Sequence, residues 1–294
     1  MVSIVVIGPG AVGGTVAAHL ARVQPAEVSV AARTPFDVLE VESDAGVLRE
    51  SPTVLTDPVG ARAVDWVLVA TKAYDADAVE PWLSRLTSAT TTVAILQNGV
   101  EHVDRFVPFV PREQLLPVVV DIPADRSAPG RIVQHGAADL IVADTERGRA
   151  FVDLFAGTGI HAHTVESLPT AMWRKLMVNA PGAINAVTLQ PRLDLSRPDV
   201  ERLVRSTMQE VVEVGRAEGA QLSENDAEAI VAALARSSGG HLNSLHADRL
   251  AGRPMEIDAR NGAVVRFGRK HGIATPVNEA LVGLLAAVDA RPAT

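Results

Sequence analysis

The feature that most constrains the fold of this chain is a glycine-rich turn near its amino terminus. An apolar run from Ile4 to Ile7 leads directly into Gly8-Pro9-Gly10-Ala11-Val12-Gly13, and a helix-like stretch from Val12 to Arg22 follows. A G-x-G-x-x-G sequence that closes a strand and opens a helix is typical of dinucleotide-binding domains. A tight turn without any ligand is the alternative, and the strand and helix on either side favour the nucleotide site.

Each position of this turn has an expected task in binding a dinucleotide. Gly8 makes the tight turn, Gly10 lets the backbone approach a pyrophosphate, and Gly13 allows the helix to pack closely on the strand. Ala11 and Val12 lie in the first helical turn, where unpaired amides and the helix dipole favour an anion. We therefore predict that these five residues bind the cofactor.

The rest of the chain divides into two parts by pattern. Apolar runs separated by helix-like stretches favour a parallel sheet covered on both faces, and they lie at Val28 to Ala32, Trp66 to Ala70 and Thr92 to Leu96. Later runs have less helix between them and predict mixed or antiparallel strands at Leu116 to Val120, Arg131 to His135 and Leu140 to Ala143.

After Leu168-Pro169 the pattern becomes helical. Helices are predicted at Met172 to Asn179, Asp199 to Glu218, Glu224 to Ser237 and Val277 to Ala290, with Ser223 and Asp226 as a capping box. Arg291 to Thr294 is expected to be a loose tail. The predicted fold class is α/β, with a doubly wound Rossmann-type sheet in residues 1–166 and an all-helical domain in residues 167–294.

Composition narrows the class of protein further. Of the 294 residues, 47% are hydrophobic and 21% are charged, which indicates a globular chain. The formal charge of -8 and the aromatic content of 3% disfavour binding of nucleic acid, which needs cations and stacking rings. No apolar stretch approaches the roughly 20 residues of a membrane span, and the start of the chain lacks signal-peptide features. Because the chain has no cysteine, we expect a cytoplasmic protein without disulfides.

The end of the second predicted strand indicates which dinucleotide is bound. NAD-binding domains usually carry an acidic residue there, which holds the ribose hydroxyls. This chain has Ala31-Ala32-Arg33-Thr34, and a guanidinium suits the 2′-phosphate of NADP through paired hydrogen bonds. The sequence therefore predicts NADPH/NADP+ as the cofactor, with a solvated surface arginine as the alternative interpretation of Arg33.

Polar residues follow two later strands of the predicted sheet. Lys72 comes after the strand at 66–70 and Asn98 after the strand at 92–96. Because the carboxyl ends of parallel strands face the ligand crevice, both are candidate contacts to cofactor or substrate. An ordinary strand-ending turn is an equal alternative for Asn98-Gly99, since Asn-Gly is a common turn pair.

The helical half offers a second group of candidates. Lys175 and Asn179 are four residues apart and share one face of a predicted helix, as either a solvent-exposed stripe or a site. Glu256 lies in a Pro-Met-Glu-Ile-Asp run, where an acid near a helix start could instead be purely structural.

Taken together, these elements resemble the ketopantoate reductase family of 2-dehydropantoate 2-reductases, nearly from end to end. In the first half, the residues that carry the resemblance are the glycine turn with Gly14, Arg33, Thr71-Lys72-Ala73-Tyr74, Leu96-Gln97-Asn98-Gly99-Val100, Pro129-Gly130 and His135-Gly136. In the second half they are Trp173-Arg174-Lys175-Leu176, Asn179, Ser244, Asp248, Gly252-Arg253-Pro254-Met255-Glu256-Ile257-Asp258 and Gly272-Ile273-Ala274-Thr275-Pro276. Their order and spacing across two domains make the resemblance specific.

The resemblance implies an NADPH-dependent reduction of 2-dehydropantoate to pantoate, a step of pantothenate biosynthesis. It implies an NADP-binding Rossmann domain and a helical substrate domain, with a 2-oxo acid as the substrate. Members of the family are monomers or dimers, and we expect this chain to form a homodimer. We expect no metal, because hydride transfer to a ketone needs none when a lysine donates the proton. Consistent with that, the chain lacks a pattern such as H-E-x-x-H, and His161 and His163 are expected to point in opposite directions.

The resemblance also implies roles for individual residues. The residue matching Lys175 is the general acid, and the one matching Glu256 assists it. The residue matching Asn98 touches both cofactor and substrate, and the one matching Lys72 lies near the cofactor. Residues matching Asn179 and Ser244 bind the substrate.

Three positions depart from the family pattern. A second substrate-contacting asparagine usually follows the first by four residues, but position 183 is Ala, so Asn185 is the candidate for that role. Met255 stands where threonine is frequent and Asn243 where serine is frequent. These departures leave open an NADP-dependent reductase of a different 2-oxo acid or another hydroxyacid dehydrogenase. A non-catalytic NADP(H)-binding sensor would explain the glycine turn and Arg33 alone.

Overall fold

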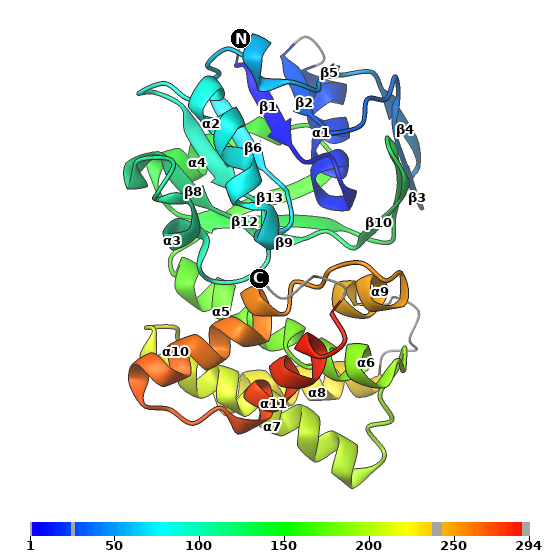
Figure 1. The fold of residues 1–294 in the computed structure, drawn as a ribbon, viewed down its shortest axis with the longest axis vertical. Helices are drawn as coiled ribbons and strands as arrows, with labels where there is room; N and C mark the ends of the chain where they lie inside the picture. The colour runs from blue at the N-terminus through cyan, green and yellow to red at the C-terminus, as the bar shows by residue number, and fades with distance from the viewer. Residues whose placement is uncertain (1, 25–26, 237–242, 290–294) are drawn as a thin grey trace. The chain divides into compact units, whose positions relative to one another are not determined.

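The computed structural model describes residues 2–24, 27–236 and 243–289, which fold into two compact units (Figure 1). The first unit contains the chain up to Gln97 together with His102–Glu166. The second contains the helices from Ser167 onward and also the short segment Asn98–Glu101. The Ser237 and Ala290 ends of two predicted helices, and the predicted tail from Arg291, lie outside the described residues.

The first unit is built on a parallel sheet of six strands. Their order is β5-β2-β1-β6-β7-β8, and every neighbouring pair is parallel. This is the order of the doubly wound dinucleotide-binding fold, in which ligands bind beside the strand where the order reverses. The strands are β1 (Ile4–Ile7), β2 (Val28–Ala31), β5 (Thr53–Leu55), β6 (Trp66–Val69), β7 (Thr92–Ile95) and β8 (Leu115–Pro117).

The sheet forms because its central strands are apolar on both sides. All four residues of β1, β6 and β7 are buried, as expected for parallel strands covered on both faces. Helix α1 (Ala11–Val23) packs against β1 and β2, with Val16, Ala17 and Leu20 fully buried. Shorter helices in this unit are α2 (Glu80–Leu86), α3 (His102–Phe106) and α4 (Glu146–Leu154).

Two smaller sheets complete the first unit. A four-stranded sheet contacts α1 and contains β10 (Ala124–Ala128), β11 (Arg131–Gln134), β3 (Leu39–Ser43) and β4 (Gly46–Glu50), in that order. A three-stranded sheet contains β13 (Ile160–Val165), β12 (Ala138–Ala143) and β9 (Val119–Asp121). Both sheets mix parallel and antiparallel pairs. The single strand predicted over Leu116 to Val120 was wrong: Pro117 lacks an amide hydrogen and ends β8, and β9 joins a different sheet.

The second unit is helical, so the α/β class with a Rossmann-type sheet and an all-helical second part is confirmed. No helix among the described residues is long and apolar enough to cross a membrane. A break between two helices lies at Pro181-Gly182, because proline cannot donate the backbone hydrogen bond that would continue the preceding helix. The helices are α5 (Leu168–Asn179), α6 (Gly182–Thr188), α7 (Pro198–Ala217), α8 (Glu224–Arg236), α9 (Ser244–Leu250), α10 (Ala263–His271) and α11 (Pro276–Ala286), with a π-helical turn, η5 (Asp258–Gly262), before α10.

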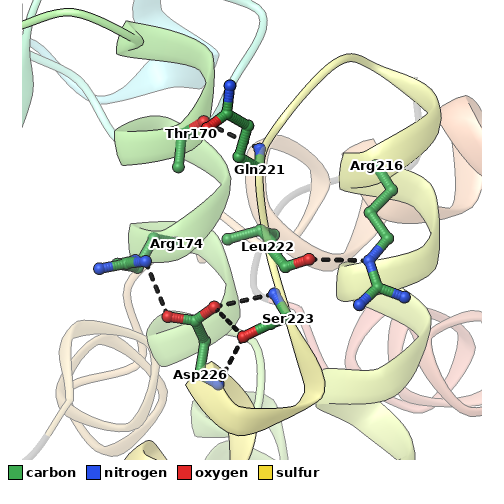
Figure 2. A network of polar contacts seen from close by, with 7 residues as sticks. All are labelled: Thr170, Arg174, Arg216, Gln221, Leu222, Ser223 and Asp226. Atoms are coloured by element: carbon green, nitrogen blue, oxygen red, sulfur yellow. Dashed lines mark hydrogen bonds and ion pairs between the residues drawn. The ribbon is translucent and has the colours of Figure 1, made fainter.

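A polar network fixes α5, the helix that carries Lys175 and Asn179 (Figure 2). The predicted capping box is present: the Ser223 amide donates to Asp226 Oδ2 at 2.8 Å, and the Asp226 amide donates to Ser223 Oγ at 3.2 Å. The same Asp226 carboxylate accepts from Arg174 NH2 at 2.7 Å. Because Arg174 lies on α5, the start of α8 holds α5 in place through charge-assisted bonds.

Candidate active site

Two glycines of the first turn are required by packing within the chain. Gly8 has φ +83°, and a Cβ there would lie 2.8 Å from Thr71 Cγ2. A Cβ on Gly13 would lie 2.3 Å from the Gly8 carbonyl oxygen and 2.8 Å from Ala70 Cβ. Both distances are below van der Waals contact, so the turn after β1 and the end of β6 approach closely only because these residues are glycine.

Gly10 differs from its neighbours. A Cβ on Gly10 would meet only the Gly8 carbonyl oxygen, at 3.9 Å, so packing within the chain does not require glycine there. Gly10 is the N-cap of α1, and neither a capping side chain nor an acidic residue occupies the first turn that contains Ala11 and Val12. An uncapped, uncharged helix start with a bare backbone beside it fits a pyrophosphate.

The ends of β2, β6 and β7 carry the remaining residues proposed for the cofactor. Arg33 is exposed two residues beyond β2, and Lys72 is partly buried at the N-cap of the short turn η2 (Ala73–Asp75). Gln97 connects two of these strand ends, because its Nε2 donates to Thr71 Oγ1 at 3.2 Å and to the Lys72 carbonyl at 3.4 Å. Gln97 was not among the residues predicted from the sequence to bind cofactor or substrate.

Gln97 is itself fixed from the other side. Arg105 NH1 donates to Gln97 Oε1 at 3.0 Å, and His102 Nε2 donates to the Gln97 carbonyl at 2.7 Å. His102 is buried, and burial lowers the pKa of its imidazole to about 4. The ring is therefore neutral at physiological pH, and its hydrogen bond to the Gln97 carbonyl helps to position the backbone that follows β7.

The segment Asn98–Glu101 packs with the second unit. Asn98 Nδ2 donates to Glu256 Oε2 at 3.4 Å, which brings together two predicted site residues far apart in sequence. Arg266 binds Glu101 through two hydrogen bonds of 3.0 and 2.6 Å. Gly99 has φ +107°, and a Cβ there would lie 2.5 Å from the Ala259 carbonyl oxygen, so only glycine permits this contact.

The other predicted residues of the helical unit lie on three elements. Lys175 and Asn179 are both partly buried on α5, beside the buried Leu176. Ser244 is exposed at the first position of α9, and Glu256 is buried ahead of the π-helical turn. A lysine, two asparagines, a serine and a carboxylate in one unit can donate a proton and bind a carboxylate or carbonyl.

Both halves of the chain match models of a known protein family. The family model described as Ketopantoate reductase PanE/ApbA matches residues 4–147, and the model described as Ketopantoate reductase PanE/ApbA C terminal matches residues 168–289. The chain belongs to the ketopantoate reductase family. It is accordingly an oxidoreductase of that class.

Individual members of the ketopantoate reductase family are similar over nearly their whole length. A 2-dehydropantoate 2-reductase from Caulobacter vibrioides is 50% identical over 97% of this chain and 98% of the relative. One from Mycobacterium tuberculosis is 37% identical over 98% of both chains. Among solved structures, a dimeric ketopantoate reductase from Staphylococcus aureus matches with a TM-score of 0.88 at 25% identity, covering 98% of each chain.

One polar residue of this ketopantoate reductase family member was not predicted from the sequence. Arg260 lies on the π-helical turn and is 1% exposed. Its NH1 donates to Ser244 Oγ at 3.1 Å, and its NH2 donates to the Asn179 carbonyl. Burial lowers the pKa of the guanidinium to about 10, against the opposing influence of Glu256 and Asp248, so it is charged at neutral pH. A lone arginine in a helix-like stretch gives no sequence signal of burial, because π-helical turns have no recognisable pattern.

Asn185, by contrast, is used within its own turn. Its Nδ2 donates to the Gln190 carbonyl at 2.8 Å, across Leu189, which has a left-handed backbone with φ 56°. The side chain thereby closes the end of α6. Among the predicted substrate-binding residues, this one has a visible structural task.

The expected orientation of His161 and His163 was wrong. Residues two apart on a strand point to the same face, and here the two rings stack with centroids 4.8 Å apart on β13. Asp139, opposite His161 on β12, accepts from His161 Nδ1 at 2.8 Å and lies 3.3 Å from His163 Nδ1. The three residues form a cluster of potential metal ligands in the first unit.

Proposed function

We propose that this chain catalyses the NADPH-dependent reduction of 2-dehydropantoate to pantoate. The observation that carries the proposal is the match of both parts of the chain to the ketopantoate reductase family. The 50% identity to a curated 2-dehydropantoate 2-reductase over nearly the whole chain supports the same substrate.

The glycine turn and the strand ends around it fit the cofactor. Gly8 and Gly13 shape the turn, while Gly10, Ala11 and Val12 present backbone to the pyrophosphate. Exposed Arg33 binds the 2′-phosphate in this proposal, and Lys72 lies near the cofactor from the end of β6. When bound, NADPH supplies the hydride that reaches the C2 carbon of the substrate.

Residues of the helical unit support the chemistry at the ketone. As the C2 carbonyl is reduced, negative charge develops on its oxygen, and the protonated Lys175 amine stabilises this charge and then donates the proton. Glu256 assists by orienting the lysine, and Asn98, which donates to Glu256, contacts cofactor and substrate. Asn179 and Ser244 hold the carboxylate and hydroxyl of the substrate, while Asn185 is the weaker candidate because it closes its own turn.

A different 2-oxo acid is the second candidate substrate, because three positions depart from the family pattern. In the structure Ala183 and Met255 are buried in the helical core, and the Asn243 side chain caps α9 by accepting from the His246 amide at 3.1 Å. Each of the three residues that differ from the family pattern therefore has a structural role within the chain. This favours 2-dehydropantoate over an altered substrate.

Steady-state kinetics test the proposal directly. The purified chain is assayed with 2-dehydropantoate and a panel of other branched 2-oxo acids, each with NADPH and with NADH. We expect the highest kcat/KM for 2-dehydropantoate with NADPH. A higher kcat/KM for another acid would change the substrate, and the absence of turnover with every acid would favour an NADP(H)-binding sensor. Size-exclusion chromatography with light scattering tests the proposed homodimer, which the dimeric relative supports.

A further inference from the structure

Arg260 is a fully buried cation that joins two of the proposed substrate-binding positions. Its guanidinium donates to Ser244 Oγ on α9 and to the Asn179 carbonyl at the end of α5, and both acceptors are neutral oxygens. Its Nε is buried without a hydrogen-bond partner. Because a buried cation is costly unless its surroundings compensate it, such a residue persists where its charge is useful.

The chain makes room for this cation. A Cβ on Gly182, at the start of α6, would lie 3.1 Å from Arg260 NH2 and 2.9 Å from Asn243 Cγ. Glycine is a poor helix former, so its position here indicates that close approach of the guanidinium to α6 outweighs helix propensity. Two buried acids, Glu256 and Asp248, lie near enough to favour the charged guanidinium.

The contact with Arg260 defines what Ser244 can do. A hydroxyl oxygen that accepts from a guanidinium directs its own hydrogen elsewhere, and a charged donor strengthens that hydrogen as a donor. Ser244 is exposed while Arg260 is buried beneath it. The pair therefore presents an outward O–H donor backed by positive charge, which suits an anionic group.

We propose that Arg260 is a positioning residue for the carboxylate of the 2-oxo acid, acting through the Ser244 hydroxyl. This inference rests on the proposed function. The guanidinium holds the Ser244 oxygen, orients its hydrogen outward and raises the local positive potential, without itself touching the substrate. The competing role is purely structural, with Arg260 serving only as the counter-charge of Glu256 and Asp248.

A charge-matched pair of substrates separates these roles. KM and kcat are measured for 2-dehydropantoate and for its uncharged methyl ester, in the wild type, R260Q, R260K, S244A and the double variant R260Q/S244A. The matched control is N261A, which alters the same buried turn: Asn261 Nδ2 donates to the Ala180 carbonyl at 3.1 Å and to Asn278 Oδ1 at 2.8 Å, away from Ser244. Thermal melting is recorded for every variant.

We expect R260Q to raise KM for the acid by at least about tenfold, because a charge-assisted hydrogen bond contributes that much. KM for the ester and for NADPH should change less than about twofold on the same reasoning. The KM of R260Q/S244A for the acid should be no higher than the KM of whichever single variant has the higher value, since one residue acts through the other. N261A should lower the melting temperature and leave KM for the acid unchanged.

Other outcomes overturn the inference. If R260Q raises KM for the acid and for the ester equally, or only lowers the melting temperature as N261A does, Arg260 is structural. If the effects of R260Q and S244A on KM for the acid multiply in the double variant, Arg260 does not act through Ser244. Should R260Q fail to fold, R260K decides, because it keeps the charge but loses one contact and should still affect the acid more than the ester. Wild-type turnover with an unaffected R260Q overturns this inference alone, whereas a wild type without turnover overturns the proposed function as well.

The cluster of Asp139, His161 and His163 carries a second inference on independent grounds. The Asp139 Oδ1 atom lies 2.8 Å from His161 Nδ1 and 3.3 Å from His163 Nδ1. Two ligands about 2.1 Å from one metal ion are about 3.0–3.4 Å apart, so the 3.3 Å separation fits a shared ion and the 2.8 Å separation has to lengthen slightly when the ion binds. His163 Nδ1 is buried and forms no aligned hydrogen bond, although it faces the carboxylate.

The geometry points to a Zn²⁺ site made by these three side chains, with water completing the coordination. Two imidazoles and one carboxylate form a ligand set that zinc commonly takes. The cluster lies in the first unit, and no step of the proposed reduction uses it. A histidine nitrogen that binds the ion carries no hydrogen, so the hydrogen of each imidazole then lies on the other ring nitrogen.

Calorimetric titration of the untagged, chelator-treated protein with ZnCl₂ tests the site. We expect one saturable Zn²⁺ per chain, weakened at least about tenfold in D139N and in H163A. The control is H135A, since His135 also pairs with a carboxylate, Asp125, at 2.8 Å, but without a second histidine in that pair. Equal binding in wild type, D139N and H163A, or no saturable binding in the wild type, overturns the site.

Discussion

The glycine turn and the surroundings of Arg260 are assembled in opposite ways. The turn is made by six consecutive residues, and its glycines are explained by neighbours such as Thr71 and Ala70 at the end of one adjacent strand. The surroundings of Arg260 join the end of α5, the start of α9 and a π-helical turn, and its bond to Asn179 spans 81 residues of sequence. A motif of consecutive residues can be interpreted from the amino-acid sequence of that segment alone. A site assembled from distant helices becomes visible only when the fold brings its parts together.

The largest expected effect lies in the helical unit, at the proposed general acid. Lys175→Ala should lower kcat/KM by about 100-fold or more, because general acid catalysis typically contributes this much. NADPH affinity, measured by fluorescence titration, should stay within about twofold, because the cofactor residues are elsewhere. Arg174→Ala is the control on the same helix, since Arg174 pairs with Asp226. Full activity of Lys175→Ala would remove Lys175 from the mechanism.

The next effect concerns stability of the first unit at low pH. Above pH 6.5 the His102 ring is neutral in both folded and unfolded chains. Below it, only the unfolded chain takes up the proton, so stability falls until the folded pKa of about 4 is reached. The loss approaches about 3 kcal/mol in total, at up to about 1.4 kcal/mol per pH unit. Urea unfolding at pH 7.5 and pH 5 should show a smaller drop for His102→Asn than for wild type; equal drops would contradict the assignment.

A pair of glycine variants tests whether the turn separates packing from binding. Gly13→Ala should destabilise the fold by about 1–3 kcal/mol, because its Cβ would overlap the Gly8 carbonyl oxygen. Gly10→Ala should leave the melting temperature nearly unchanged and weaken NADPH binding, because its Cβ meets nothing closer than 3.9 Å within the chain. If both variants destabilise the fold equally, Gly10 has a packing task and the distinction fails.

The smallest effect is expected for the choice between cofactors. Arg33→Ala should raise KM for NADPH by about tenfold, the size of one charge-assisted contact, and should leave KM for NADH nearly unchanged. Arg22→Ala is the control, because Arg22 is exposed on α1 and pairs with Glu50 instead. A wild type that prefers NADH would overturn the cofactor assignment itself.

Local features of the fold were predictable from the sequence. The alternation of β1, α1 and β2, the break between α5 and α6, and the reciprocal bonds of Ser223 and Asp226 all follow from residues close in sequence. Strands β3, β4 and β10 were missed because they are half exposed and rich in charged residues, which hides the apolar pattern.

Long-range polar contacts were not predictable. Glu210 on α7 is buried, and its carboxylate accepts from the amides of Val277 and Asn278 at 2.8 and 2.9 Å. It thereby caps α11 across 67 residues of sequence, in place of a local capping residue. In the sequence Glu210 is only one more acid on an amphipathic helix, just as Arg260 is only one more arginine.

The short segment Asn98–Glu101 has a consequence for how this protein folds. It is synthesised within the first half of the chain, yet Arg266, the partner of Glu101, follows it by 165 residues. Residues 167–289 alone therefore lack the glycine that packs on Ala259 and the carboxylate that binds Arg266. Cutting the chain after Glu166 would yield a helical fragment without these contacts, so the second unit is complete only when Asn98–Glu101, from the first half of the chain, packs with it.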